Sequence, residues 1–121
     1  MQDYRNLEVW RQMHQVTLAI YRDTVSFPSE ERFGLVSQLR RAAASVGANL
    51  AEGCGRGSDA DFARFVQMAS GSASEVDYHL LLARDLSYIT AETYGARANQ
   101  LASVRRMLSA LLTRLRPKLG Q

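Results

Sequence analysis

Polar side chains that could do chemistry recur beside the apolar stripe of residues 34–57 and again in residues 71–79. At about 100° per residue, each set falls on one helical face, and the two faces can meet across a helix–helix contact. The members are Arg41, Asn49 and Glu52 in the first segment, and Ser72, Glu75 and His79 in the second. Such a set suits an active site or a ligand site, or else a satisfied polar network that fixes helix register. The sequence favours the network, with Arg41 and Glu75 in a buried or half-buried pair whose loss costs about 3 kcal/mol.

A carboxylate-bridged di-metal site is the sharpest enzymatic alternative for Glu75 and His79. Such sites occupy bundle cores and use a Glu-x-x-His pair from each of two helices. Here the two residues are four positions apart, and only Glu52 and His14 could add ligands. The sequence therefore predicts no metal and no cofactor, and it places His14 and His79 at the edge of the core.

The glycines of residues 53–57 precede a helix start, an arrangement that can cradle phosphate. Asp59 and Asp61 in that first turn would repel an anion, and the Lys-Ser/Thr ending of a Walker A loop is absent. A helix C-cap followed by a tight turn is the favoured interpretation. Cys54 is the single cysteine, which excludes an intrachain disulfide and suits a reducing compartment. It has no evident catalytic base.

Short breakers divide the chain into four amphipathic helices, and no segment is typical of a strand. Ser29, Ser58 and Thr90 are the expected N-caps. Small residues crowd 42–51 and 71–74, so these two helices are expected to pack closely. The expected helices are residues 6–25, Ser29 to the glycines at 53–57, 58–86, and 90–117. The prediction is an all-α, antiparallel up-down-up-down four-helix bundle, a single domain over residues 1–121.

The first of these helices is apolar over a wider arc than one groove requires. Val9 and Val16 lie on one flank, and Leu7 and Leu18 lie on the other. Excess apolar surface of this kind faces another subunit. The start of the chain is polar and charged, and no run reaches the ~18 apolar residues of a membrane span. We therefore expect a cytoplasmic homo-oligomer with no membrane contact.

The net charge of +3 is unevenly distributed, because all twelve acidic residues lie in 1–92. The last 29 residues hold six basic side chains: Arg97, Arg105, Arg106, Arg114, Arg116 and Lys118. They surround the exposed circumference of the last helix, except Arg97, whose place on the apolar stripe indicates a pairing with an acid. A solvated helix face is the alternative. Copies converging in a ring would turn this weak basic face into a dense field.

Several ordered motifs together cover about residues 5–90. They are Asn6-Leu7-Glu8-Val9-Trp10, Phe27-Pro28-Ser29-Glu30-Glu31 with Phe33-Gly34-Leu35, Gln38-Leu39-Arg40-Arg41-Ala42-Ala43, Asn49-Leu50-Ala51-Glu52-Gly53, Phe62-Ala63-Arg64-Phe65 and Gly71-Ser72-Ala73-Ser74-Glu75. In these motifs the chain resembles the four-helix-bundle proteins encoded in intervening sequences of bacterial 23S rRNA genes. Relatives of that family include the accessory variability protein of diversity-generating retroelements. The resemblance implies an antiparallel bundle, a homopentameric ring and a nucleic-acid-binding role without established catalysis.

The resulting hypothesis is a non-enzymatic homo-oligomer that binds structured RNA, such as rRNA, or DNA through phosphate contacts of low sequence specificity. The alternative is a scaffold or adaptor that binds another protein, for example a reverse transcriptase. Salt-dependent nucleic-acid binding separates the two. An enzyme would require a metal or a ligand in the core.

Overall fold

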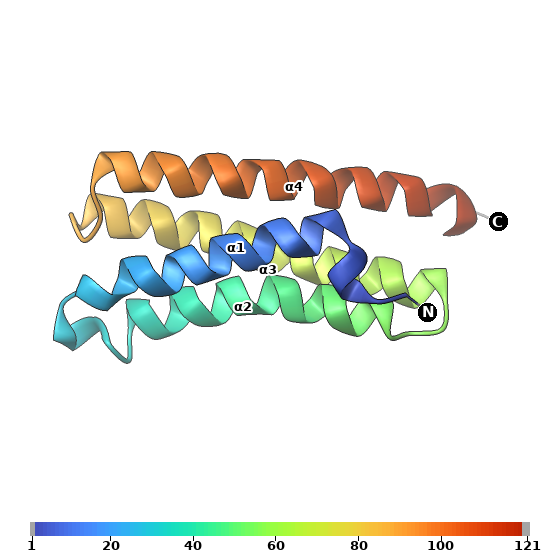
Figure 1. The fold of residues 1–121 in the computed structure, drawn as a ribbon, viewed down its shortest axis with the longest axis horizontal. Coiled ribbons are helices and arrows are strands. Elements are labelled where there is room, and N and C mark those ends of the chain that lie inside the picture. The colour runs from blue at the N-terminus through green and yellow to red at the C-terminus, as the bar shows by residue number, and fades with distance from the viewer. Residues whose placement is uncertain (1, 120–121) are drawn as a thin grey trace.

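Four α-helices form the bundle in the computed structural model, which describes the backbone of residues 2–119 and the side chains of residues 2–116. Consecutive helices run in opposite directions along the long axis, and the two ends of the chain lie at the same end of the bundle (Figure 1). The helices are α1 (Glu8–Asp23), α2 (Leu35–Cys54), α3 (Asp59–Asp85) and α4 (Ala91–Leu119), with short 3-10 turns η1 (Tyr4–Asn6), η2 (Thr24–Ser26) and η3 (Ser29–Glu31). The prediction of an all-α four-helix bundle is confirmed, with no strand in the described backbone.

Apolar residues three and four positions apart on each helix meet in one central core. Met13 and Ile20 of α1 pack with Leu50 of α2 and Leu108 of α4, all fully buried. A smaller cluster of Phe27, Leu35, Val36 and Ala83 closes the bundle end at the α1–α2 connection. Each fully buried Leu or Ile side chain stabilises the fold by about 1.5–3 kcal/mol, so core burial fixes which helix faces point inward.

The start of α2 differs from the prediction, because Ser29 lies in η3 and does not cap the helix. Instead Glu31 reaches forward, and its Oε1 accepts the amide of Leu35 at 3.1 Å while its Oε2 accepts the Tyr88 hydroxyl at 2.9 Å. A Cβ on Gly34 would lie 2.8 Å from Glu31 Oε1, so a side chain there would collide with this cap. A longer acid held by a distant tyrosine thus replaces the local serine cap.

The other predicted boundaries hold to within a few residues. Ser58 Oγ accepts the amide of Asp61 at 3.1 Å, and Thr90 Oγ1 accepts the amide of Thr93 at 3.0 Å, so both caps are confirmed. The first helix ends at Asp23, because the chain tightens into η2 before the proline turn. The last helix continues two residues past Pro117, within the usual variation at helix ends.

Small residues of α2 and α3 are buried where these helices pack, among them Ala43 and Ala73, and Gly53 lies in a crowded position near the end of α2. A Cβ on Gly53 would lie 2.9 Å from the Cβ of Phe65 and 3.0 Å from Cδ1 of Phe62. Gly71, by contrast, has nothing within 4 Å of its Cβ position. Ala48 is exposed on the side of α2 that faces α1. Gly53 is therefore a position where the α2–α3 contact leaves no room for a side chain.

Candidate nucleic-acid interface

The predicted contact between Arg41 and Glu75 forms at the surface of the α2–α3 seam. Arg41 Nη2 lies 2.8 Å from Glu75 Oε2, but the two side chains are 62% and 37% exposed. The predicted pairing is therefore confirmed, but only Glu75 is half-buried, and Arg41 is exposed. Helical periodicity gave the direction of these side chains correctly, but both are long enough to carry their charged ends to the solvent rim.

The remaining members of the predicted network are separate from that ion pair. Ser45 Oγ and Ser72 Oγ are 2.9 Å apart, and the amide nitrogen of Asn49 donates to the carbonyl and hydroxyl of Ser45 at 2.9 and 3.1 Å. Glu52 is exposed and contacts no described side chain. His79 is buried, with its Nδ1 lacking a hydrogen-bond partner among the described residues. Of these contacts, the hydrogen bond between Ser45 and Ser72 ties α2 to α3, whereas Asn49 bonds within α2.

The residues considered as metal ligands lie apart. The described residues contain no group of three or more His, Cys, Asp or Glu side chains that could hold a metal ion. His14 is exposed on α1, where its ring stacks on Trp10 with centroids 4.9 Å apart and planes at 10°. The expected place of His14 at the core edge is wrong, because the outer side of α1 is open to solvent at this level.

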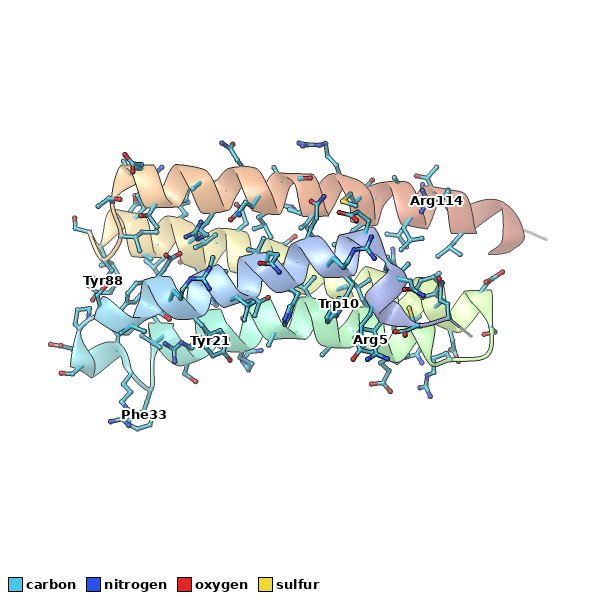
Figure 2. All side chains as sticks on the ribbon, in the orientation of Figure 1. Arg5, Trp10, Tyr21, Phe33, Tyr88 and Arg114 are labelled. Carbon is cyan, nitrogen blue, oxygen red and sulfur yellow. The ribbon has the colours of Figure 1, made fainter. Side chains whose placement is uncertain are left out.

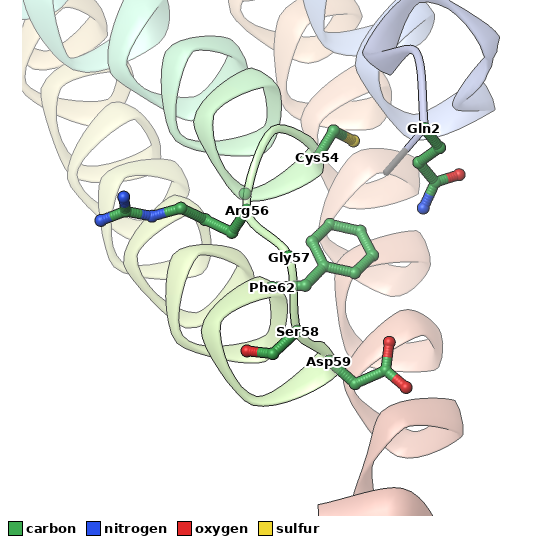
Figure 3. Close-up of a pocket in the computed structure, with 8 residues that line it drawn as sticks. Gln2, Cys54, Arg56, Gly57, Ser58, Asp59 and Phe62 are labelled. Atoms are coloured by element: carbon green, nitrogen blue, oxygen red, sulfur yellow. The ribbon is translucent and has the colours of Figure 1, made fainter.

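The glycine-rich turn between α2 and α3 caps α2. The amide of Gly55 donates to the carbonyls of Ala51 and Glu52, and the amide of Arg56 donates to that of Gly53, so neither points at a ligand. This confirms the C-cap interpretation. A pocket of about 150 Å³ lies beside the turn, and Figure 3 shows Arg56 pointing away from it.

Cys54 lines the same pocket but is 3% exposed, and burial raises the pKa of its thiol. A buried thiol with a raised pKa is a poor nucleophile, because the thiolate is the reactive form. The turn therefore has the features of a structural element rather than those of a reactive or anion-binding loop.

Two of the basic residues predicted to contact phosphate pair with acidic side chains of neighbouring helices. Arg97 donates to Asp23, with Nε 2.6 Å from Oδ2 and Nη2 3.1 Å from Oδ1, and the two side chains are only 19% and 16% exposed. Arg105 contacts Asp77 at 3.4 Å and the hydroxyl of Ser74 at 3.2 Å, both on α3. Arg97 therefore forms the pairing with an acid that its place on the apolar stripe indicated, and its guanidinium offers little exposed surface to a phosphate.

Three other α4 arginines remain open to solvent. Arg106, Arg114 and Arg116 are exposed, and none of them contacts a carboxylate among the described side chains. Figure 2 shows Arg114 toward the C-terminal end of α4. The predicted Lys118 has its side chain outside the described residues. The free positive charge of α4 thus lies in its C-terminal half.

The outer side of α1 and α2 carries an apolar groove of about 440 Å³. Trp10, Leu18 and Tyr21 of α1 face Gly47 and other small residues of α2 across it. Leu18 and Tyr21 are 39% and 42% exposed. The excess apolar surface predicted for the first helix therefore exists, but on one flank.

The other flank of α1 is covered within the bundle. Val9 and Val16 of that flank are buried, and Leu7, which the sequence pattern places on the same flank as Leu18, also packs against the core. These three apolar side chains therefore pack within a single chain and need no second copy to cover them.

A second groove, which the sequence analysis did not identify, lies where α1 ends and α2 begins. Arg32, Phe33 and Arg40 line it together with Tyr21. The available signal was Phe33, an aromatic residue outside the apolar stripe of α2 and preceded by an arginine.

These features define an all-α bundle protein with exposed charged and apolar surfaces. The chain belongs to the 23S rRNA-intervening sequence protein family, whose sequence profile matches residues 5–110. A similar solved structure is that of a protein of unknown function from the S23 ribosomal protein family of Bacteroides thetaiotaomicron VPI-5482, at 27% identity and a TM-score of 0.77. The match covers 86% of this chain and 97% of that one. No curated protein is similar enough to match. None of the described helices is long and apolar enough to cross a membrane.

Proposed function

We propose that the protein is a non-enzymatic, cytoplasmic homo-oligomer that binds structured RNA or DNA through phosphate contacts. The observation that carries this proposal is the set of exposed arginines Arg106, Arg114 and Arg116, in a 29-residue stretch without any carboxylate. Guanidinium groups bind phosphate oxygens in a bidentate manner, and neutralised phosphates release counterions. Ribosomal RNA, after which the family is named, is the first ligand to test.

Assembly multiplies this surface. The apolar groove of α1 and α2 is the proposed contact between copies, because Leu18 and Tyr21 remain partly exposed in a single chain. A ring of five, as the family resemblance implies, would bring five copies of the α4 surface into one assembly. Light scattering at micromolar concentration tests this step, and a monomeric mass at physiological salt would remove the avidity argument.

Anisotropy titration of labelled hairpin RNA and duplex DNA against salt tests the binding step. We expect the combined change Arg106→Glu, Arg114→Glu and Arg116→Glu to abolish binding at about 50 mM salt without loss of helicity or assembly. A matched control changes Arg22, Arg64 and Arg84 to Glu, which shifts net charge equally at exposed arginines outside α4. Equal loss in both variants would contradict a specific α4 surface.

A protein-binding scaffold or adaptor, for example for a reverse transcriptase like those of diversity-generating retroelements, is the second candidate. The apolar groove favours it, because a groove of about 440 Å³ suits a partner helix as well as another copy. If the wild-type protein binds no duplex, hairpin or single-stranded substrate at about 50 mM salt, this function takes first place.

A further inference from the structure

The groove at the start of α2 combines positive charge with exposed aromatic rings. It measures about 430 Å³, and its lining residues are Tyr21, Arg32, Phe33, Val36, Ser37, Arg40 and Arg41. No acidic residue lines it. Figure 2 shows Phe33 and Arg114 toward opposite ends of the bundle, so this groove and the α4 surface are separate.

Two arginines of the groove have no carboxylate partner among the described side chains. Arg40 donates from Nε to Thr24 Oγ1 at 2.8 Å and from Nη2 to the carbonyl of Tyr21 at 3.1 Å, which are both neutral acceptors. Its guanidinium lies 4.7 Å from the centroid of the Tyr21 ring, which holds it in place. The guanidinium of Arg32 lies 5.5 Å from the centroid of the Phe33 ring and forms no ion pair with a described side chain. The groove therefore presents fixed positive charge without an internal counterion.

The acids that directly precede Arg32 in the sequence, Glu30 and Glu31, are not among the lining residues of this groove. Glu75 offsets the charge of Arg41 alone. The carboxylate of Glu31 accepts the Leu35 amide and the Tyr88 hydroxyl. The lining itself, which holds three arginines and no acidic residue, therefore favours an anionic ligand.

Phe33 supplies the second half of the site. Its side chain is 88% exposed, and Figure 2 shows it projecting from the connection before α2, away from the helices. One side of its ring meets Arg32, and the high exposure leaves the other side open to a flat ligand. Exposed aromatic rings beside arginines are the usual platform for unpaired bases, because every base has a face that can stack.

We propose that this groove binds an unpaired nucleotide of single-stranded RNA or DNA. The base stacks on Phe33, and the adjoining phosphate lies against Arg32 and Arg40. An acidic peptide with an aliphatic anchor fits less well, since Val36 is the single aliphatic side chain in the lining. This inference rests on the proposed function for its ligand class, but it assigns a different site and a preference for unpaired strands.

Photo-crosslinking tests the stacked contact directly. Full-length protein is irradiated with an eight-nucleotide RNA that carries 5-iodouridine, and the modified residue is located by mass spectrometry. We expect the crosslink at Phe33. In parallel anisotropy titrations, Phe33→Ala lowers affinity for the unmodified single strand about tenfold, Phe33→Trp restores it, and affinity for a duplex of the same sequence is unchanged.

The matched control is Val25→Ala, since Val25 is 76% exposed at the same bundle end but does not line the groove. Arg32→Ala is compared with Arg22→Ala in the same way. We expect both control variants to bind the single strand as the wild-type protein does.

Three outcomes overturn the inference. The first is wild-type affinity for single strands in Phe33→Ala. The second is Phe33-dependent binding of a peptide rich in Glu and Leu in place of RNA. The third is a lower oligomer mass of Phe33→Ala, which would make the groove a contact between copies.

The α4 arginine variant separates the two proposals. If only the groove proposal is wrong, structured RNA still binds in a manner that depends on the α4 arginines, while Phe33→Ala has no effect on the affinity for single strands. If only the α4 proposal fails, the crosslink at Phe33 persists while structured RNA binds independently of the α4 arginines. Absence of all nucleic-acid binding overturns both.

Discussion

Arg97 near the start of α4 donates two hydrogen bonds, of 2.6 and 3.1 Å, to the carboxylate of Asp23, the last residue of α1. Gln100 adds an acceptor at 3.2 Å from Nη1. Because both charged side chains are largely withdrawn from water, removing one strands the other. The pair therefore fixes how the first and last helices meet at this end of the bundle.

We expect Arg97→Ala to lower the free energy of unfolding by about 2–3 kcal/mol. Arg97→Lys loses the two-pronged geometry and recovers only part of that loss. Urea denaturation measures both, with Arg106→Ala as the control, since Arg106 is exposed and is expected to change stability by less than about 0.5 kcal/mol. Equal stability of Arg97→Ala and Arg106→Ala would contradict the structural role.

The pair of Arg41 and Glu75 is expected to contribute much less. Exposed ion pairs are worth about 0–1 kcal/mol, because water and salt screen them. Arg41→Ala should therefore cost about 0.5 kcal/mol, in place of the 3 kcal/mol expected for a buried pair. A double-mutant cycle with Glu75→Gln measures the coupling, and a loss that persists at high salt would point to burial after all.

The two glycines discussed for the α2–α3 packing are expected to respond oppositely to alanine. Gly53→Ala places a methyl group against Phe62 and Phe65 and should destabilise the fold by about 1–3 kcal/mol. Gly71→Ala adds a methyl in open space inside a helix and should stabilise it by about 0.5–1 kcal/mol. Thermal unfolding measures the stability of both variants. A change of the same sign in both would contradict the inferred difference in packing at Gly53 and Gly71.

Tyr88 is expected to ionise later than an ordinary tyrosine. Its hydrogen bond to Glu31, followed by burial, raises the pKa of the phenol. A raised folded-state pKa means that this stabilisation is complete below the ordinary pKa of about 10 and is lost as pH rises through the raised value. Phenolate absorbance during alkaline titration measures this. Tyr88→Phe should remove the last phase of the titration, whereas an unchanged curve would contradict the contact.

Helical periodicity and the residues at helix ends were enough to predict the four helices and most of their boundaries. Ser58 and Thr90 act as caps because each needs only an amide three residues away. Ser29 could not be judged in this way, since the real cap, Glu31, is held by a tyrosine 57 positions later. Local sequence rules describe contacts within one helical turn. The contact between Glu31 and Tyr88 instead depends on where α3 ends in the folded bundle.

For the candidate site, the sequence predicts the direction in which side chains point but not how deeply they are buried. Periodicity placed Arg97 on the apolar stripe, and its partial burial follows. The same reasoning put Arg41 beside Glu75 but could not show that both charged ends reach water. The position of the Arg40 guanidinium could not be predicted, because its acceptor Thr24 lies in a different element, η2.

The carboxylate of Glu31 has a consequence for how the molecule opens. One side chain closes the first turn of α2 and also the connection that leads into α4, so neither can loosen without releasing the other. We therefore expect the amides of Leu35 and Tyr88 to exchange with deuterium at a common opening free energy. Fraying at this end would then be a concerted event of two chain segments rather than the independent motion of two loops.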